Sequence, residues 1–184
     1  MENIPSEFQE IATVGGGCFW CTEAQFQILD GVVSVESGYS GGKIKNPAYR
    51  EVCLGITGHA EVIQVVFDTR KLTYTDILKA FFVSHDPTQL NRQGNDVGTQ
   101  YRSVIFYHSE GQRETAEKII NDLTAEKIYS APIVTEVSPF TVFYKAEDYH
   151  QNYFNQNQDQ PYCYYVVTPK LDKFRKVFAD RLMR

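Results

Sequence analysis

Three consecutive glycines, Gly15 to Gly17, separate two different residue patterns and constrain the fold more than any other feature of this chain. Before them, residues 11–14 form a short apolar run that predicts a strand. After them, residues 19–29 carry apolar side chains at helical spacing and end at Gly31, which predicts a helix and its stop. The glycines therefore mark a turn from a strand into a helix.

The middle of the chain continues this alternation of strands and helices. Apolar and β-branched runs at residues 32–38, 60–67 and 101–107 predict three further strands, and residues 74–84 carry one apolar helical face. The predicted order is βαββαβ, which is the ferredoxin-like or split βαβ signature. We therefore expect an α+β fold in which two helices pack on one face of a mixed, mainly antiparallel sheet.

The remainder of the chain predicts additions to that core. Ser109 and Gln112 fit a capping box that opens a charged helix, and residues 133–137 predict another strand. An apparent strand follows Cys163, and Thr168 fits the cap of a last helix with proline at its first position. The long loops that remain span residues 40–58, 86–100 and 139–151.

Length and charge exclude several classes of protein. The chain has 184 residues, the size of one ordinary domain, so we expect a single domain over residues 1–184. Its net charge is −5 and its lysines and arginines form no basic stripe, so we expect no nucleic-acid partner. No window approaches the roughly 20 apolar residues of a spanning helix, and the polar N-terminus does not resemble a secretory signal. These features predict a cytoplasmic protein with no membrane partner.

Cys18 stands where the glycine turn ends and the predicted helix begins. The N–H groups and positive dipole of a helix N-terminus stabilise a thiolate, so we expect a Cys18 pKa below the free value of about 8.5. Cys21 lies one helical turn away and could trap an oxidised Cys18 as a disulfide. Phe19 and Trp20, between them, suggest an apolar substrate pocket. The motif favours redox chemistry, and the alternative is a cysteine that only packs in the core.

A CxxC pair alone also fits half a zinc site or a thioredoxin-like dithiol. Zinc needs two more ligands, and Cys53, His59 and Cys163 do not form a second closely spaced pair, so we expect no metal. Cys53 has apolar neighbours and is predicted to pack. The two bulky aromatics between Cys18 and Cys21 would crowd the approach of a protein disulfide.

Several polar residues gain weight only in combination. Glu61 lies at the edge of an apolar strand, where burial would raise its pKa and make it a proton donor near neutral pH. A solvent-facing glutamate is the simpler alternative for this segment alone. Asp96 lies in a loop rich in polar groups, where it is either functional or a turn former. Tyr49 and Tyr101 lie in or beside loops, where a phenol either donates a hydrogen bond to a ligand or caps the core.

Five motifs occur together in this chain: GCFWC at 17–21, GYSGG at 38–42, GHAEV at 58–62, HDPTQLNRQGNDVGTQYRS at 85–103 and AEDYHQNYF at 146–154. In this order they closely resemble the peptide methionine sulfoxide reductase A family, from about residue 14 to residue 154. The resemblance implies a ferredoxin-like α/β core wrapped by extra strands and loops. That expectation agrees with the βαββαβ pattern, which was obtained from the residues alone.

The resemblance implies a role for each polar residue. Cys18 attacks the sulfur of methionine S-sulfoxide, either free or within a protein. A sulfoxide oxygen departs poorly as an anion, so it must be protonated and hydrogen-bonded as its bond to sulfur weakens. By the family pattern Glu61 supplies that proton, the Tyr49 and Tyr101 hydroxyls bind the oxygen, and Asp96 orders the polar side of the site.

The resemblance also implies how the enzyme binds the methyl group and is recycled. Phe19 and Trp20 cradle the methyl group, and no cofactor is required. Oxidised Cys18 is a sulfenic acid that condenses with a second thiol, and thioredoxin then reduces the disulfide. Many members have glycine at the position of Cys21 and recycle through a C-terminal tail, so this chain departs from the pattern. We favour Cys163 as the resolving thiol, because a polar turn precedes it, and keep Cys21, which closes no long loop. A thioredoxin-like dithiol oxidoreductase and a non-catalytic sulfoxide or peptide binding module remain as alternatives.

Overall fold

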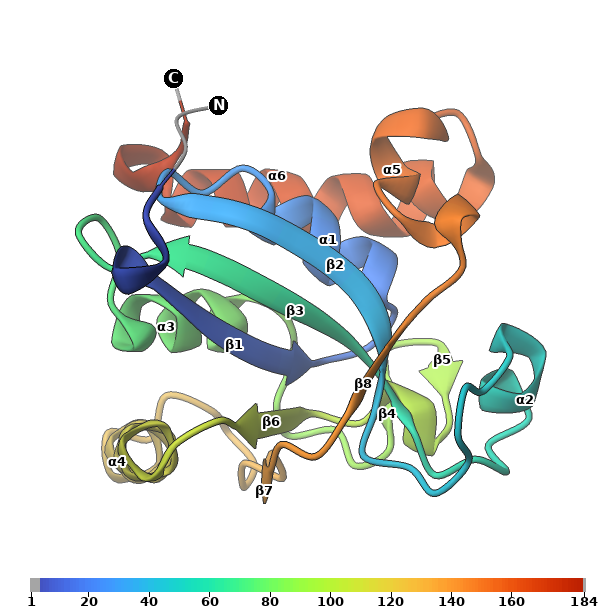
Figure 1. Ribbon diagram of the computed structural model, residues 1–184, viewed down its shortest axis with the longest axis horizontal. Coiled ribbons are helices and arrows are strands. Elements are labelled where there is room, and N and C mark those ends of the chain that lie inside the picture. Colours follow the sequence, from blue (N-terminus) through green and yellow to red (C-terminus); the bar gives the residue numbers. More distant parts are fainter. Residues whose placement is uncertain (1–3, 184) are drawn as a thin grey trace.

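The computed structural model describes residues 4–183, and its centre is a mixed six-stranded sheet (Figure 1). The strands are β1 (Gln9–Gly15), β2 (Val32–Ser40), β3 (Ala60–Asp68), β6 (Val104–Tyr107), β7 (Glu136–Pro139) and β8 (Phe143–Lys145). Their order in space is β7-β6-β1-β3-β2-β8. The strands pair in an antiparallel manner except for β6 and β7, which are parallel.

The four inner strands have the order β6-β1-β3-β2, which is the ferredoxin-like arrangement. Helix α1 (Phe19–Phe26) connects β1 to β2, and helix α3 (Tyr74–Ser84) connects β3 to β6. The predicted fold class is therefore confirmed. The structure also confirms the bounds predicted for α3, where Thr73 caps the helix by accepting a hydrogen bond from the Asp76 N–H at 3.2 Å.

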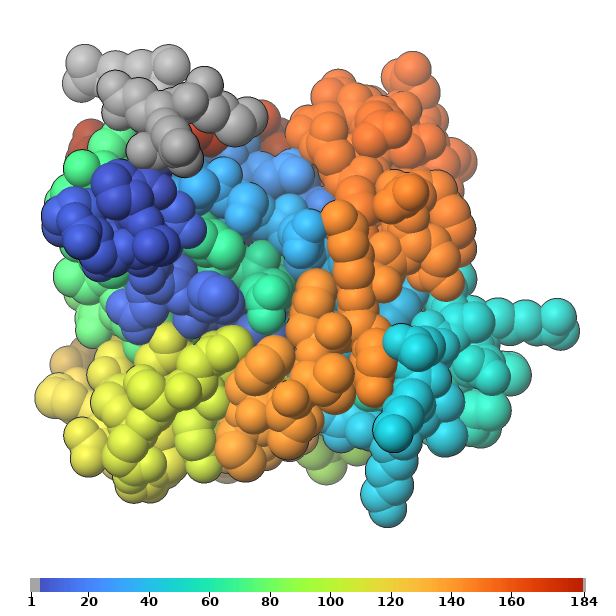
Figure 2. Space-filling model, in the orientation of Figure 1, coloured from blue at the N-terminus to red at the C-terminus, as the bar shows by residue number. Residues whose placement is uncertain are grey.

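The helices gather on one face of the sheet. In Figure 1, α1, α3 and α6 (Thr168–Val177) lie behind the strands, and α4 (Glu110–Ala125) lies at the end of the sheet beside β6. Phe26 of α1 and Phe81 of α3 are completely buried, and Phe174 of α6 is 1% exposed. Figure 2 shows the opposite face in the same orientation, crossed by the orange segment that contains β8.

The long loops contain short elements that the residue pattern does not predict. They include α2 (Tyr49–Cys53), β4 (Arg92–Gln93), β5 (Asp96–Val97), η2 (Thr99–Tyr101) and η3 (Asp148–His150), and the short helix α5 (Tyr153–Gln156) follows the last of these loops. Two further short helical turns lie near the ends of the described chain, at η1 (Ser6–Phe8) and η5 (Ala179–Arg181). Because η2 occupies the start of the run predicted as a strand at residues 101–107, β6 begins only at Val104. The strand predicted at 133–137 is β7, displaced towards the C-terminus.

The strand predicted after Cys163 is wrong. Residues Cys163–Val167 form the π-helical segment η4, which runs directly into α6. Thr168 is therefore not an N-cap, and its hydroxyl donates to the Cys163 carbonyl at 3.0 Å. The side chains that this continuous helical run buries are Cys163, Val167, Leu171 and Phe174. Their spacing is helical, and it outweighs the β-branched character of the short valine pair.

The capping box predicted for α4 is half formed. Ser109 accepts a hydrogen bond from the Gln112 N–H at 3.2 Å, as predicted. The Gln112 side chain instead accepts from the His108 N–H at 3.0 Å and donates to Glu10 and Ile11 on β1. It therefore ties α4 to the sheet. Across residues 4–183, no helix combines the length and the apolar content needed to cross a membrane.

Candidate active site

The glycine turn brings the start of α1 against β3. A Cβ atom at Gly15 would lie 2.5 Å from the Glu61 carbonyl oxygen, so only glycine permits this approach of the two strands. Gly17 has a φ of +89°, which a residue with a side chain adopts only under strain. Its N–H donates to the Tyr101 carbonyl at 3.2 Å. Cys18 follows as the N-cap of α1, next to Glu61 and Tyr101.

The Cys18 thiol is buried, since only 8% of the residue is exposed. Burial raises the pKa of Cys18 well above its ordinary value, and a hydrogen bond with the Cys21 thiol and the charge of Glu61 raise it further. The backbone N–H of Trp20 at the helix start lowers it by less. The prediction that the helix N-terminus gives Cys18 a low pKa is therefore wrong, because desolvation is the larger effect in this structure.

Glu61 lies beside the first turn of α1. Its Oε2 accepts a hydrogen bond from the Phe19 N–H at 3.0 Å, and the residue is 1% exposed, so the solvent-facing alternative is wrong. Within residues 4–183, no cationic side chain lies within ion-pair distance of this carboxyl group. Burial consequently raises the pKa of Glu61 to about 8, against the opposing effect of the Phe19 hydrogen bond. A carboxyl group that is largely protonated at neutral pH therefore lies next to Cys18.

Glu147 connects two tyrosines at the other side of the site. Its Oε2 accepts from the Tyr39 hydroxyl and its Oε1 from the Tyr49 N–H, both at 2.9 Å. The Tyr49 hydroxyl interacts with the half-buried Cys53 thiol, so Cys53 lies beside the site and is not part of the core cluster. Burial raises the pKa of Tyr49, and Glu61 is close enough for its charge to contribute. The Tyr49 hydroxyl thus stays protonated at neutral pH and keeps a proton to donate.

Tyr101 and Asp96 form the third side of the site. Burial, Glu61 and Cys18 raise the pKa of Tyr101, which places its half-buried phenol close to both groups. Asp96, on β5, accepts a hydrogen bond from the Tyr162 hydroxyl at 2.6 Å. Tyr162 precedes η4, so this bond holds the segment that bears Cys163 against the site.

The two predicted methyl-binding aromatics have different surroundings. Phe19 is 1% exposed, and its ring centroid lies 5.8 Å from that of Tyr39 and 5.1 Å from that of His150. Trp20 is only partly buried and stacks on Tyr153 with a centroid distance of 3.7 Å and an interplanar angle of 6°. The Trp20 Nε1–H donates to His150 Nδ1 at 3.0 Å. Of the pair, Trp20 is the one that presents surface outside the core.

His150 and Glu147 were not recognised individually from the sequence. Both belong to the segment AEDYHQNYF, and that motif was the available signal. His150 is fully buried among aromatic rings, and burial lowers its pKa, which keeps the imidazole neutral. These two residues organise Trp20, Tyr39 and Tyr49 from a distant part of the chain.

Cys21 shares its surroundings with three groups. Its thiol interacts with Cys18, and its Sγ lies 3.9 Å from both the Tyr162 hydroxyl and the Lys170 Nζ. The hydrogen bond with Cys18 lowers the pKa of Cys21 against burial, and Lys170 and Tyr162 lower it further. Of the two thiols, Cys21 is therefore the one that loses its proton more readily, and Cys18 is the one that keeps it.

Cys163, the other resolving candidate, is completely buried at the start of η4. Its N–H donates to Gln160 Oε1 at 3.1 Å, and burial followed by the charge of Cys21 raises its pKa. It therefore lies near Cys21 in an ordered turn, not in a mobile tail. All four cysteines are free thiols.

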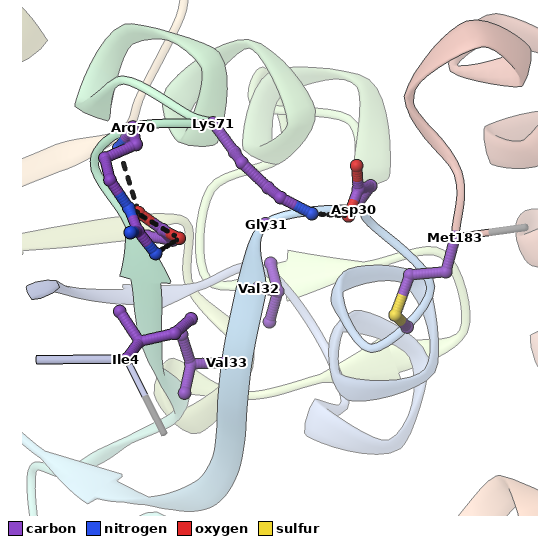
Figure 3. A pocket seen from close by; sticks show the side chains of 9 residues that line it. Ile4, Asp30, Gly31, Val32, Val33, Arg70, Lys71 and Met183 are labelled. Atoms are coloured by element: carbon purple, nitrogen blue, oxygen red, sulfur yellow. Dashed lines mark hydrogen bonds and ion pairs between the residues drawn. The ribbon is translucent and has the colours of Figure 1, made fainter. Parts of the chain in front are cut away.

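The cavity shown in Figure 3 lies elsewhere, where β2 begins and β3 ends. Charged residues Asp30, Asp68, Arg70 and Lys71 line it together with apolar residues such as Val32. It contains none of the predicted site residues. Among residues 4–183, no group of three or more histidine, cysteine or acidic side chains is placed to hold a metal ion.

Comparison with known proteins identifies the relatives of this chain. A family model described as peptide methionine sulfoxide reductase matches residues 10–182. Peptide methionine sulfoxide reductase MsrA of Saccharolobus solfataricus is 54% identical over 173 residues, which cover 94% of this chain and 97% of that protein. The MsrA of Deinococcus radiodurans is 53% identical over 178 residues, covering 97% of this chain and 86% of that protein.

Solved structures give the same relationship. Mxr1 from Saccharomyces cerevisiae in its reduced form has a TM-score of 0.81 at 34% identity, covering 88% of this chain and 92% of Mxr1. Methionine sulfoxide reductase A of Corynebacterium diphtheriae has a TM-score of 0.73 at 37% identity, covering 85% of this chain and 78% of that one. A structure of Mxr1 in complex with Trx2 has a TM-score of 0.58 at 27% identity, covering 82% and 88% of the two chains.

Proposed function

Because this chain belongs to the peptide methionine sulfoxide reductase family, we propose that its buried Cys18 and Glu61 carry out the thiol-dependent reduction of methionine sulfoxide. Cys18 is the nucleophile and Glu61 is the proton donor. The observation that carries these roles is the 3.0 Å hydrogen bond from the Phe19 N–H to Glu61 Oε2, which places a protonated carboxyl group one residue from the Cys18 backbone. Sulfoxide reduction needs a sulfur nucleophile and an acid at the same point.

The first half of the reaction forms a sulfenic acid. Cys18 attacks the sulfoxide sulfur as its thiol proton passes to Cys21, its hydrogen-bond partner. Glu61 donates its proton to the sulfoxide oxygen, so the substrate sulfur then carries a hydroxyl group and the new bond to the Cys18 sulfur. Both of these bonds break as the hydroxyl moves to the Cys18 sulfur, one electron pair remains on the sulfur of the departing methionine, and Glu61 is left as a carboxylate. Charge and protons balance, because each proton that is given up has an acceptor.

The residues around Cys18 and Glu61 fit the polar oxygen and the apolar methyl group of methionine sulfoxide. The Tyr49 and Tyr101 phenols keep their protons, because burial raises both pKa values, and they donate to the sulfoxide oxygen. Asp96 orders the polar side through its bond to Tyr162. The partly exposed Trp20 side chain receives the methyl group, and the buried Phe19 ring packs against His150, which accepts the Trp20 hydrogen bond. A polar side and an apolar side around one nucleophile discriminate between the two epimers, and we propose that the S epimer is the one that this site accepts.

The direct contact between the Cys18 and Cys21 thiols supports Cys21 as the group that attacks the Cys18 sulfenic acid. Cys21 interacts directly with Cys18, whereas Cys163 is held in η4 and is influenced by Cys21. Capture by Cys21 needs no rearrangement of a segment that Gln160 and Thr168 hold by hydrogen bonds. Thioredoxin then reduces the disulfide, a role supported by the structure of the related Mxr1 in complex with Trx2.

The test is turnover of resolved methionine sulfoxide epimers by the purified protein with a dithiol. We expect consumption of the S epimer alone and no turnover by Cys18→Ser. Equal use of both epimers, or turnover by Cys18→Ser, would contradict the proposed site. Disulfide reductase activity that survives Glu61→Gln would instead favour a thioredoxin-like dithiol oxidoreductase.

The resolving thiol is tested separately, in a single turnover of pre-reduced enzyme with no reductant added. We expect Cys163→Ala to form a disulfide after one turnover, and Cys21→Ala to stop at the sulfenic acid. The reverse result would show that Cys163 is the thiol that attacks the Cys18 sulfenic acid. Counting free thiols after a single turnover distinguishes the two results without relying on the steady-state rate.

A further inference from the structure

Lys170 is a half-buried cation whose ammonium group is directed at a thiol. Its Nζ lies 3.9 Å from Cys21 Sγ, within hydrogen-bond distance for sulfur. Within the part of the chain that the structure describes, no carboxylate lies within 4.0 Å of this ammonium group. A lysine in this setting ordinarily pairs with an acid, so a thiol as the partner calls for an explanation.

The fold holds Lys170 in this position. Leu171 and Phe174 fix α6 to the core, because both are almost fully buried. The Gln25 side chain donates from α1 to the Lys170 carbonyl at 3.4 Å. Gln25 lies one turn beyond Cys21 on the same face of α1. The backbone at Lys170 is thus fixed beside the helix that bears Cys21, and the ammonium group reaches the sulfur from there.

The groups around Cys21 provide one positive charge. The Cys18 thiol hydrogen-bonds to Cys21, and the Tyr162 hydroxyl lies 3.9 Å from its sulfur. Among the groups named as influencing Cys21 within residues 4–183, Lys170 is the cation, and it lowers the pKa of that thiol. The titratable groups that face this cluster from other elements are Asp96 on β5, Glu61 on β3, Cys163 on η4 and His85 at the end of α3, whose imidazole is kept neutral by burial beside Lys170.

We infer that Lys170 is a catalytic residue of the resolving step, where its ammonium group holds Cys21 as the thiolate that attacks oxidised Cys18. The inference rests on the proposed role of Cys21 as the capturing thiol. In this step the Cys21 sulfur donates an electron pair to the sulfur of the Cys18 sulfenic acid, and the S–O bond breaks. The departing hydroxyl leaves as water with the proton that the Cys21 thiol has given up. Cys21 is oxidised, Cys18 is reduced from the sulfenic level, and one disulfide forms.

Removing the charge has two opposing effects on the rate of this step. A thiol that loses a neighbouring cation gains about one unit of pKa, which cuts its thiolate fraction roughly tenfold at neutral pH. A more basic thiolate is intrinsically more nucleophilic, which recovers roughly threefold. We therefore expect Lys170→Met to form the disulfide about threefold more slowly at pH 7, with the pH midpoint of this step raised by about one unit.

The experiment follows one turnover in a Cys163→Ala background, where Cys21 is the capturing thiol of the proposal. Reduced enzyme is mixed with one equivalent of methionine S-sulfoxide and quenched at intervals. Methionine is measured as the product. The remaining sulfenic acid is trapped with a cyclic 1,3-dione, and the adduct is quantified by mass spectrometry. The ratio of disulfide-forming to methionine-forming rates should fall about threefold in Lys170→Met, and Lys170→Arg should restore it. Lys173→Met is the matched control, since Lys173 is an exposed lysine one turn along α6.

An unchanged ratio and pH midpoint in Lys170→Met would overturn the inference. Equal losses in Lys170→Met and Lys170→Arg, with an unmoved midpoint, would also overturn it, because they indicate a packing role. Lys170→Gln replaces the methionine variant if that variant does not fold. Failure of the proposed function gives a different result, because a Cys163→Ala parent that accumulates sulfenic acid without forming a disulfide shows that Cys21 is not the capturing thiol.

Discussion

Two carboxyl groups near opposite ends of β3 differ in pKa although neither side chain is exposed to solvent. Glu61 and Asp68 are each 1% exposed. The pKa of Glu61 is raised to about 8, whereas that of Asp68 is lowered to about 2. One carboxyl group lies against the cysteines, and the other lines the cavity of Figure 3.

The difference follows from the partners of the two groups and from their depth, because desolvation is the main influence on Glu61 and the Arg70 hydrogen bonds are the main influence on Asp68. The Arg70 guanidinium donates to both oxygens of Asp68 at 2.6 to 3.2 Å, and the Arg70 N–H adds a further bond at 3.0 Å. Glu61 accepts one backbone hydrogen bond and has no cation within ion-pair distance in the described chain. Burial alone therefore does not identify a catalytic acid. A buried carboxyl group without a cation keeps its proton and can donate it, whereas a paired one serves structure.

The largest expected effect is the loss of activity on replacing Glu61. Glu61→Gln keeps the size of the side chain and its acceptor for the Phe19 N–H but has no acidic proton. General acid catalysis typically contributes 10² to 10⁴, so we expect the rate of methionine formation in a single turnover to fall by about that factor.

Asp68→Asn is the matched control for that experiment. It makes the same chemical change on the same strand, at a carboxyl group that contacts no proposed site residue. We expect its single-turnover rate to stay close to that of the parent. Comparable losses in both variants would mean that β3 tolerates no such change and that Glu61 has no special role.

The pH dependence of the parent sharpens the comparison. Because the protonated form of Glu61 is the active one, the rate of methionine formation should fall as pH rises through about 8, approaching tenfold per unit above it. Glu61→Gln should lack this fall, which separates it from the titration of the cysteines. A parent rate that rises through pH 8 would show that thiol ionisation, and not the carboxyl proton, limits the reaction.

Features of the fold and the site that depend on residues close together in the sequence were predictable, and features that depend on distant segments were not. Local periodicity gave the bounds of α3 and the βαββαβ order, since both depend on residues a few positions apart. Cys18 at the start of α1 was likewise predictable from the glycines before it. The family motifs added the expectation that Glu61 is an acid, and the structure supplied its burial.

The remainder depends on contacts between distant segments. The raised pKa of Cys18 reflects burial by the whole fold, which the helix-start pattern does not report. The bonds from Trp20 to His150 and from Tyr162 to Asp96 join residues from different thirds of the chain. Periodicity within one segment contains no information about such pairs.

A third prediction concerns stability, because the ionised form of Glu61 is destabilising in a buried site with no cation beside it. Its raised pKa gives a stabilising contribution that is fully present below the unfolded-state pKa of about 4.5 and is lost as pH rises towards 8. The parent should lose about 1.4 kcal/mol of unfolding free energy per pH unit in that window from this group. Glu61→Gln should not, so its stability relative to the parent should increase between pH 5 and pH 7. Urea unfolding at the two pH values measures the difference, and a constant gap would contradict the raised pKa.

The smallest effect should come from the paired carboxyl group. The depressed pKa of Asp68 gives a stabilising contribution that is present above the unfolded-state pKa of 3.8 and is lost as pH falls through about 2. Asp68→Asn should therefore have a lower urea midpoint than the parent at pH 6, and the gap should close as the pH approaches 2. The shift should be modest, because the Arg70 side chain is 49% exposed and water screens its charge. A gap that instead widens with acid would show that Asp68, like Glu61, keeps its proton in the folded protein, and the contrast between the two ends of β3 would be lost.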